Sequence, residues 1–262
     1  MNKSLKILMV GNSFSDDISY YVPHILGNLG HKNIEVANLY IGGCSLKRHN
    51  DNIISGEPAY EFRYFSNGAW DEKLDGELKS LEFGLKFRDW DIISLQQASV
   101  ESGKEESYNE ALTSVVEYLM KNATNSQVKL VWNMTWAYAN GFSNLCLYGN
   151  DQMQMYNAIT SCVANKIEGN DRFCTVVPAG TTIQNLRTSF LGDTLNRDGT
   201  HLSIPVGRFA GALTFVSATI GCDLDKLDCI VEGITAQEFT AIKECVKNAL
   251  ANKYTVTNSK IK

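Results

Sequence analysis

Short apolar runs alternate along the chain with longer segments in which apolar residues recur at helical spacing. Strands buried on both faces read as nearly continuous hydrophobic runs, whereas amphipathic helices repeat about every 3.6 residues. The alternation predicts an α/β protein of three layers, α/β/α, in which helices cover both faces of a five-stranded parallel sheet. The five expected strands are LKILMVG from residue 5, IEVANLYIGG from 34, WDIISLQQ from 90, VKLVWNMTW from 128 and FCTVVPAG from 173.

Two of the expected helices have recognisable ends. Apolar residues at helical spacing from Ile18 to Leu29 predict the first helix. Pro23 has to lie in its first turn or bend it, because proline lacks a backbone donor. Near the other end of the chain, the T-A-Q-E sequence of residues 235–238 is a capping box. It predicts a C-terminal helix at about 236–252 whose apolar stripe packs on the core.

The segment at about 46–84 interrupts this alternation. Within it, Asn67-Gly68 stands between alternating aromatic residues, which is the signal of a two-residue hairpin turn. We interpret the segment as an insertion, so that residues 1–262 form a single domain. Its aromatic residues could form a lid, a platform for a sugar ring, or a small cluster that seals the insertion. They are Tyr64, Phe65 and Trp70.

Composition narrows the function classes. Hydrophobic residues make up 44% and charged residues 20%, and the net charge is -5. The chain has no block of Lys and Arg, so we expect no nucleic-acid partner. It has neither the roughly 18-residue apolar stretch of a membrane span nor a signal-peptide core, which favours a cytoplasmic protein without a membrane partner. The seven cysteines are scattered and show no CxxC spacing, which favours reduced thiols and no metal site.

The first expected strand ends in GNSFS, residues 11–15, and ligands of open α/β sheets bind beyond such strand ends. Three interpretations are open. The loop could hold a phosphate, although neither the P-loop nor the dinucleotide glycine pattern is present. It could be a structural turn, in which Gly11 permits the bend and a serine caps the helix. Alternatively, Ser13 could be a nucleophile whose backbone N–H binds an oxyanion.

A serine nucleophile needs a general base, and the chain has only four histidines. His24 and His31 lie on or just after the first expected helix, where a structural or surface role is the simpler interpretation. His49 stands among charged residues, and we expect it to be solvated. His201 follows Asp198 by three residues in the loop NRDGTHLS. This spacing lets the carboxylate accept from the imidazole and fix its tautomer, although a helix-capping Asp with an incidental His is also open.

Taken together, these motifs resemble the SGNH/GDSL hydrolase superfamily, in particular a less characterised bacterial branch. The resemblance covers most of the chain, and its four blocks occur in order at expected strand ends. It implies a flavodoxin-like fold and a serine esterase that needs no cofactor. The blocks read Gly11-Asn12-Ser13-Phe14-Ser15, Gly42-Gly43-Cys44-Ser45, Gln96-Gln97-Ala98-Ser99 and Asp198-Gly199-Thr200-His201.

The resemblance also implies a role for individual residues. Ser13 matches the nucleophile, His201 the general base and later acid, and Asp198 the residue that orients the histidine. The backbone N–H groups of Ser13 and Gly43 match two oxyanion donors.

The third block departs from the family pattern, which usually has an Asn as third oxyanion donor. This chain has two glutamines there, and a Gln carboxamide carries the same donor on one more methylene. We expect Gln97 to be this donor, with Gln96 as the second choice. Trp136 follows the fourth strand and could either wall the acyl or sugar pocket or belong to the core.

These observations predict a serine esterase that removes a short acyl group, acetyl in our interpretation, from a saccharide or another small-molecule ester. No hydrophobic lid helix is evident, which argues against long-chain lipid substrates. Two other classes remain open. The same cleft could bind a glycan or acyl group without turnover, or the fold could hold a flavin or nucleotide. The last class gives no role to Asp198 and His201.

Overall fold

The computed structural model describes residues 4–262. A central sheet, with strands in the order β4-β3-β2-β1-β6-β7-β8, runs through the molecule, and β5 pairs with β3 beside this path. The strands β2, β1, β6, β7 and β8 are parallel neighbours, whereas β3 and β4 are antiparallel. The strand bounds are β1 Leu5–Gly11, β2 Ile34–Tyr40, β3 Tyr60–Ser66, β4 Ala69–Asp71, β5 Leu78–Lys79, β6 Ile92–Leu95, β7 Lys129–Asn133 and β8 Phe173–Val177.

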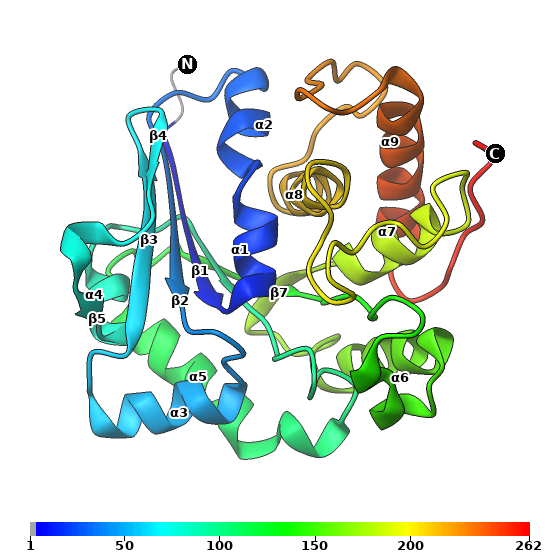
Figure 1. The fold of residues 1–262 in the computed structure, drawn as a ribbon. Helices are drawn as coiled ribbons and strands as arrows, with labels where there is room; N and C mark the ends of the chain where they lie inside the picture. The colour runs from blue at the N-terminus through cyan, green and yellow to red at the C-terminus, as the bar shows by residue number, and fades with distance from the viewer. Residues whose placement is uncertain (1–3) are drawn as a thin grey trace.

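Helices form the two outer layers (Figure 1). The helices α1, α2, α7, α8 and α9 lie on one side of the sheet, and α3, α4, α5 and α6 lie on the other. Their bounds are α1 Ser13–Ser19, α2 Val22–Asn28, α3 Leu46–Ser55, α4 Leu81–Lys86, α5 Asn109–Asn122, α6 Gln152–Lys166, α7 Ala179–Leu186, α8 Val206–Thr219 and α9 Ala236–Ala251.

The predicted fold class is confirmed, with an addition to the sheet. All five expected parallel strands are present in the 2-1-3-4-5 order of flavodoxin-like sheets. The predicted number of five strands was nevertheless wrong for the whole sheet, because residues 60–79 add three antiparallel strands at the β2 edge. The hairpin turn lies at Asn67-Gly68, and both residues have positive φ, at 52° and 87°. Such turns match the twist of the two strands that they join.

The first predicted helix is in fact two. The helix α1 ends at Ser19, and α2 begins at Val22 with Pro23 in its first turn. A proline ring clashes with the carbonyl four residues earlier, which here is Ser19. The break between the two helices therefore falls where the proline requires it. At the other end of the chain, α9 carries the predicted capping box between Thr235 and Glu238.

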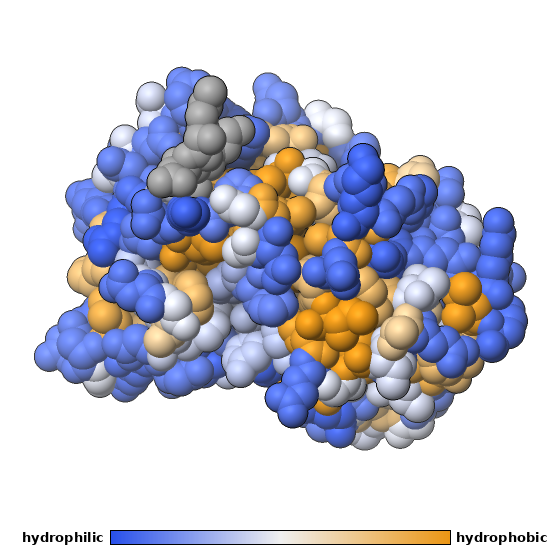
Figure 2. All heavy atoms as spheres, turned by 90° about the horizontal axis from the view of Figure 1, so that it is seen from above, coloured by the Kyte–Doolittle hydropathy of each residue, from blue (hydrophilic) through white to orange (hydrophobic). Residues whose placement is uncertain are grey.

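The core lies between the sheet and both helix layers. The strand β1 is buried along nearly its whole length, as its apolar sequence requires. The helix α8 is buried over most of its residues because α1, α2, α7 and α9 all pack around it. Viewed from above, the surface is mainly hydrophilic with separate hydrophobic patches (Figure 2). Within residues 4–262, no helix combines the length and the apolar character that crossing a bilayer demands.

Candidate active site

The nucleophile candidate stands at the carboxyl end of the sheet's central parallel strands. The strand β1 ends at Gly11, Asn12 caps the following helix, and Ser13 is the first residue of α1. The Asn12 side chain accepts a hydrogen bond from the Phe14 N–H at 3.0 Å. A Cβ at Gly11 would lie only 2.6 Å from the Ser15 hydroxyl, so this turn has room only for glycine.

The structure brings Ser13, His201 and Asp198 into one hydrogen-bonded chain. The Ser13 Oγ lies 2.7 Å from His201 Nε2, and His201 Nδ1 lies 2.6 Å from Asp198 Oδ2. The His201 side chain is 28% exposed and that of Asp198 is 49% exposed, so solvent reaches the chain. This geometry lets the imidazole take a proton from the serine while the carboxylate supports the imidazolium that forms.

The Asp198 carboxylate also shapes its own loop. Its Oδ1 accepts from the backbone N–H groups of Thr200 and His201, at 3.0 and 2.8 Å, and from the Thr200 hydroxyl at 3.0 Å. Partial burial alone would raise the pKa of Asp198, but these donors and the His201 ring outweigh it and hold the pKa well below its ordinary value. The carboxylate therefore remains ionised and oriented throughout the neutral range.

A buried carboxylate on α1 anchors the loop that carries His201. The Asp17 side chain is fully buried and accepts from the Leu202 N–H at 2.7 Å. It also accepts from Arg197 at 2.9 Å and from Arg208 at 2.7 Å. Sequence reasoning missed this role. The available signal was that Asp17 falls on the apolar face of α1, between Phe14 and Ile18, where a charge needs partners.

Trp136 occupies the second of its two expected positions, in the core. Its side chain is fully buried and stacks on Phe14 at a ring-centroid distance of 4.1 Å. The indole N–H donates to the Thr200 carbonyl at 2.7 Å, and the edge of the Phe14 ring faces His201. Trp136 thus contacts both Phe14 and the loop that carries His201, and it supports this loop from the core.

The loop of residues 41–45, which we call the glycine loop, follows β2 and reaches the site. Gly43 is exposed with a φ of 64°, and its N–H has no backbone acceptor within residues 4–262. The Ser13 N–H is one of the free donors of the first helical turn. The Asn12 side chain donates to the Cys44 carbonyl at 3.0 Å, which ties this loop to the start of α1. Two free N–H groups therefore remain candidates for an oxyanion site.

The two glutamines have separate partners. The Gln97 amide donates to the Ser107 carbonyl and hydroxyl, and its oxygen accepts from the N–H groups of Leu46 and Ala98. Gln97 therefore joins the start of α3 to the loop before α5, and both of its amide hydrogens are in use. In this conformation no amide hydrogen of Gln97 is left for an oxyanion. Gln97 could act as the third donor only by giving up a bond to Ser107, and this role stays a prediction.

Gln96 connects three strand ends. Its amide donates to Asn12 Oδ1 at 2.9 Å, and its oxygen accepts from the Asn133 amide at 3.2 Å. Since Asn12 also holds Cys44, a continuous chain of neutral amides runs from β7 through β6 and β1 to the glycine loop. Gln96 is nearer to Ser13 than Gln97 by hydrogen-bond path, and its role as an oxyanion donor likewise stays a prediction.

The expectation that His49 is solvated was wrong. Its side chain is fully buried, with Nδ1 2.9 Å from the Tyr60 hydroxyl and 3.5 Å from the Cys44 sulfur. Burial lowers the pKa of His49 to about 3 and raises the pKa of Cys44 to about 12. Both groups are therefore neutral at pH 7, and they support the glycine loop without acting as an ion pair. Among the described residues, no cluster of three or more His, Cys, Asp or Glu could hold a metal ion.

Comparisons with known proteins agree with this architecture. The family model "Domain of unknown function (DUF4886)" matches residues 6–249. A solved DUF4886 family protein from Bacteroides uniformis is 34% identical, with a TM-score of 0.91 and 98% of each chain covered. Among curated proteins, no match was found.

Two more distant solved structures share the fold. A protein from Slackia heliotrinireducens, proposed to be an SGNH hydrolase, is 19% identical with a TM-score of 0.52, over 82% of this chain and 98% of that one. A catalytic mutant of Axe2, an acetylxylan esterase from Geobacillus stearothermophilus, is 14% identical with a TM-score of 0.50, over 85% and 98%. At these identities the likeness concerns the fold alone.

Proposed function

Because the chain belongs to the DUF4886 family and shares its fold with SGNH-type structures, we propose that it is a serine esterase that removes a short acyl group, acetyl in the first instance, from a saccharide. The observation that carries the proposal is the unbroken chain from Ser13 Oγ through His201 to Asp198. A protein that only binds its ligand has no need of all three groups in this order.

The first half of the proposed reaction forms an acyl-enzyme. Ser13 Oγ attacks the ester carbonyl carbon, and its proton passes to His201 Nε2. The negative charge on the carbonyl oxygen is held by the N–H groups of Ser13 and Gly43. The bond to the alcohol oxygen then breaks, and this oxygen leaves with the proton from His201.

The second half releases the acid. Water gives a proton to His201 Nε2 and attacks the acyl carbon, and Ser13 Oγ leaves with that proton. Asp198 stays ionised in both halves, because the donors around it keep its pKa low. It therefore supports the imidazolium each time it forms.

Acetyl is favoured as the acyl group because one structure that shares the fold is that of an acetylxylan esterase. This likeness is one of fold alone. A panel of esters therefore has to accompany the saccharide substrates.

The test is hydrolysis of p-nitrophenyl acetate and acetylated xylan by the wild type, Ser13→Ala and His201→Ala. We expect both variants to lose at least about 10³ in kcat, because members of such a chain act as a unit. Ser126→Ala, which changes an exposed serine in the loop between α5 and β7, should keep wild-type activity. If the wild type hydrolyses no ester of the panel and a fluorophosphonate leaves Ser13 unlabelled, the catalytic proposal fails and a binding protein takes its place.

A further inference from the structure

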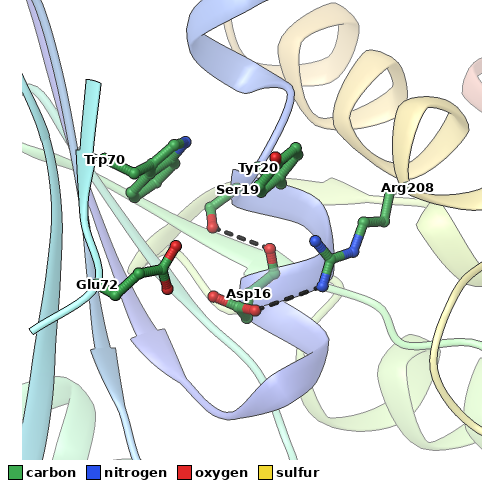
Figure 3. Close-up of a pocket in the computed structure, with 6 residues that line it drawn as sticks. All are labelled: Asp16, Ser19, Tyr20, Trp70, Glu72 and Arg208. Atoms are coloured by element: carbon green, nitrogen blue, oxygen red, sulfur yellow. Dashed lines mark hydrogen bonds and ion pairs between the residues drawn. The ribbon is translucent and has the colours of Figure 1, made fainter. Parts of the chain in front are cut away.

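A cleft separates strand β4 from helix α1 (Figure 3). Its lining residues on the α1 side, from Asp16 to Tyr20, lie about one to two turns beyond Ser13. Its volume is about 120 Å³, and it adjoins a second hollow of about 330 Å³ that shares Tyr20 and Trp70. The smaller part corresponds to roughly four water molecules. We call the two together the β4–α1 cleft. The residues around its smaller part are Asp16, Ser19, Tyr20, Trp70, Glu72 and Arg208.

One end of the cleft, at Asp16, lies near the proposed reaction centre. Residues three apart on a helix are surface neighbours, so Asp16 adjoins Ser13 at a rise of about 4.5 Å along α1. Asp16 pairs with Arg63 at 2.8 Å, and the Arg63 guanidinium lies 3.7 Å from the Tyr40 ring centre. The Tyr40 hydroxyl in turn lies 3.7 Å from where a Cβ of Gly42 would be. One wall of the cleft therefore leads to the glycine loop.

The walls combine aromatic rings with hydrogen-bonding groups. Trp70 and Tyr20 come from opposite sides, and Tyr20 is 43% exposed. The Glu72 side chain points into the space between them and has no hydrogen bond or ion pair with any residue from 4 to 262. Arg208 is directed at Asp16 and Asp17, which neutralise it. The cleft thus offers flat apolar faces and one free carboxylate within reach of each other.

This chemistry selects among ligand classes. An anionic ligand would meet the carboxylates of Asp16 and Glu72, and an acyl chain would have to desolvate them. A cation would compete with Arg208, which already lies 5.0 Å from the Tyr20 ring centre. A neutral ring that carries hydroxyl groups suits the site, since its apolar face can rest on an aromatic ring while its hydroxyls donate to carboxylates.

We propose that the β4–α1 cleft binds a sugar ring in the alcohol part of the ester, next to the acylated unit. This proposal rests on the proposed function and names its substrate class. The edge of the ring enters the smaller part of the cleft, and its face lies on Trp70 towards the adjoining hollow. Glu72 accepts hydrogen bonds from ring hydroxyls. The added antiparallel strands then take part in substrate binding, because β4 supplies Trp70.

The test compares a saccharide ester with a small ester in the same enzyme. Acetylated xylo-, manno- and chito-oligosaccharides and p-nitrophenyl acetate are assayed with the wild type, Trp70→Ala and Glu72→Gln. We expect the ratio of kcat/KM for the best oligosaccharide to that for p-nitrophenyl acetate to fall about five- to tenfold in each variant, mainly through KM. Glu57→Gln, an exposed carboxylate in the same insertion, should leave the ratio unchanged.

Two outcomes would overturn the proposal. Either the ratio stays at the wild-type value in both variants, or Trp70→Ala lowers both substrates equally. Glu72→Gln alters an exposed side chain and protects the test against misfolding of Trp70→Ala. If no ester is hydrolysed at all, the proposed function fails separately. In that case the cleft is tested by calorimetric titration of Ser13→Ala with the same oligosaccharides. Binding to Ser13→Ala that is lost when Trp70→Ala is added supports the cleft. An absence of binding to Ser13→Ala refutes it.

Discussion

The two loops that meet at Ser13 are held by different kinds of interaction. The His201 loop is fixed by charge, because Asp17 binds Arg197, Arg208 and the Leu202 N–H. The glycine loop is fixed by neutral amides, which run from Asn133 through Gln96 and Asn12 to Cys44.

The nearby His49 and Cys44 are also neutral. This difference between the two loops shows where the protein accommodates buried charge. An ion pair is expensive to bury but strong once complete, which suits a loop that must hold an imidazole within hydrogen-bond distance of a hydroxyl. Neutral dipoles suit the side on which a negative oxygen would develop, because a carboxylate there would oppose it.

The largest effect is expected from breaking the charged anchor. Asp17→Asn removes the buried carboxylate that pairs with both Arg197 and Arg208, and only Arg208 keeps a second carboxylate, that of Asp16. We therefore expect a loss of about 3–5 kcal/mol in the free energy of unfolding. The esterase activity should fall with it. Urea denaturation measures the change, and Asp51→Asn is the control, since its pair with Lys47 is exposed and worth under about 1 kcal/mol. An unchanged unfolding midpoint for Asp17→Asn would refute the charged anchor.

The second prediction concerns the neutral contact to the same loop. Trp136→Phe keeps a ring against Phe14 but removes the N–H donated to Thr200, and we expect to lose about 1–3 kcal/mol. Trp132→Phe deletes a similar volume from a buried tryptophan of β7 and is the matched control. Only Trp136→Phe should lower kcat. Equal kcat losses in the two variants would mean that Trp136 acts through core packing alone.

The third prediction turns to the glycine loop. Gly43→Ala forces a residue with a Cβ into positive φ, which costs about 1–2 kcal/mol. Gly30→Ala, in the turn after α2, has the same backbone cost. In both positions a Cβ would meet open space. Thermal unfolding should show similar losses, while only Gly43→Ala should reduce kcat by displacing its N–H. Full activity of Gly43→Ala would remove this loop from the reaction.

The smallest effect is expected from the pH dependence of Asp198. Its pKa is lowered in the folded protein, so its contribution to stability is present above the unfolded value of about 3.9 and is lost as the pH falls through the lower folded value. The difference in Tm between wild type and Asp198→Asn should therefore be constant near pH 7 and shrink below about pH 4. A difference that persists unchanged to pH 2.5 would show that charge is not its origin.

The sequence predicted those features that depend on local patterns. The parallel strands, the hairpin at Asn67-Gly68 and the capping box all follow from neighbouring residues. Three of the four blocks follow strand ends, and parallel strands bring their carboxyl ends to one edge of the sheet. The fourth block lies in the loop between α7 and α8, and the fold brings its His201 within reach of Ser13.

Other features depend on contacts between distant segments. Asp17 is bound by residues 180 to 191 positions away, so its own surroundings in the sequence could not show its partners. His49 looks solvated among charged neighbours, yet α3 turns it towards Tyr60 of β3. The hydrogen-bond partners of Gln96 and Gln97 depend on the side of the sheet to which each side chain points after β6. Side-chain partners across the chain are therefore what the sequence alone leaves undecided.

The span between Asp17 and its arginines also has a consequence for how the protein folds. The β1–α1 unit can form early, but it then carries a carboxylate on its apolar face with no cation to bind. Pairs this far apart in sequence are costly to close, and their formation is slow. The packing of α1 can be completed only when residues 197–208 have arrived, in the same step that delivers His201 to Ser13. Recovery of enzymatic activity after dilution from denaturant would then report the final docking event of the whole chain.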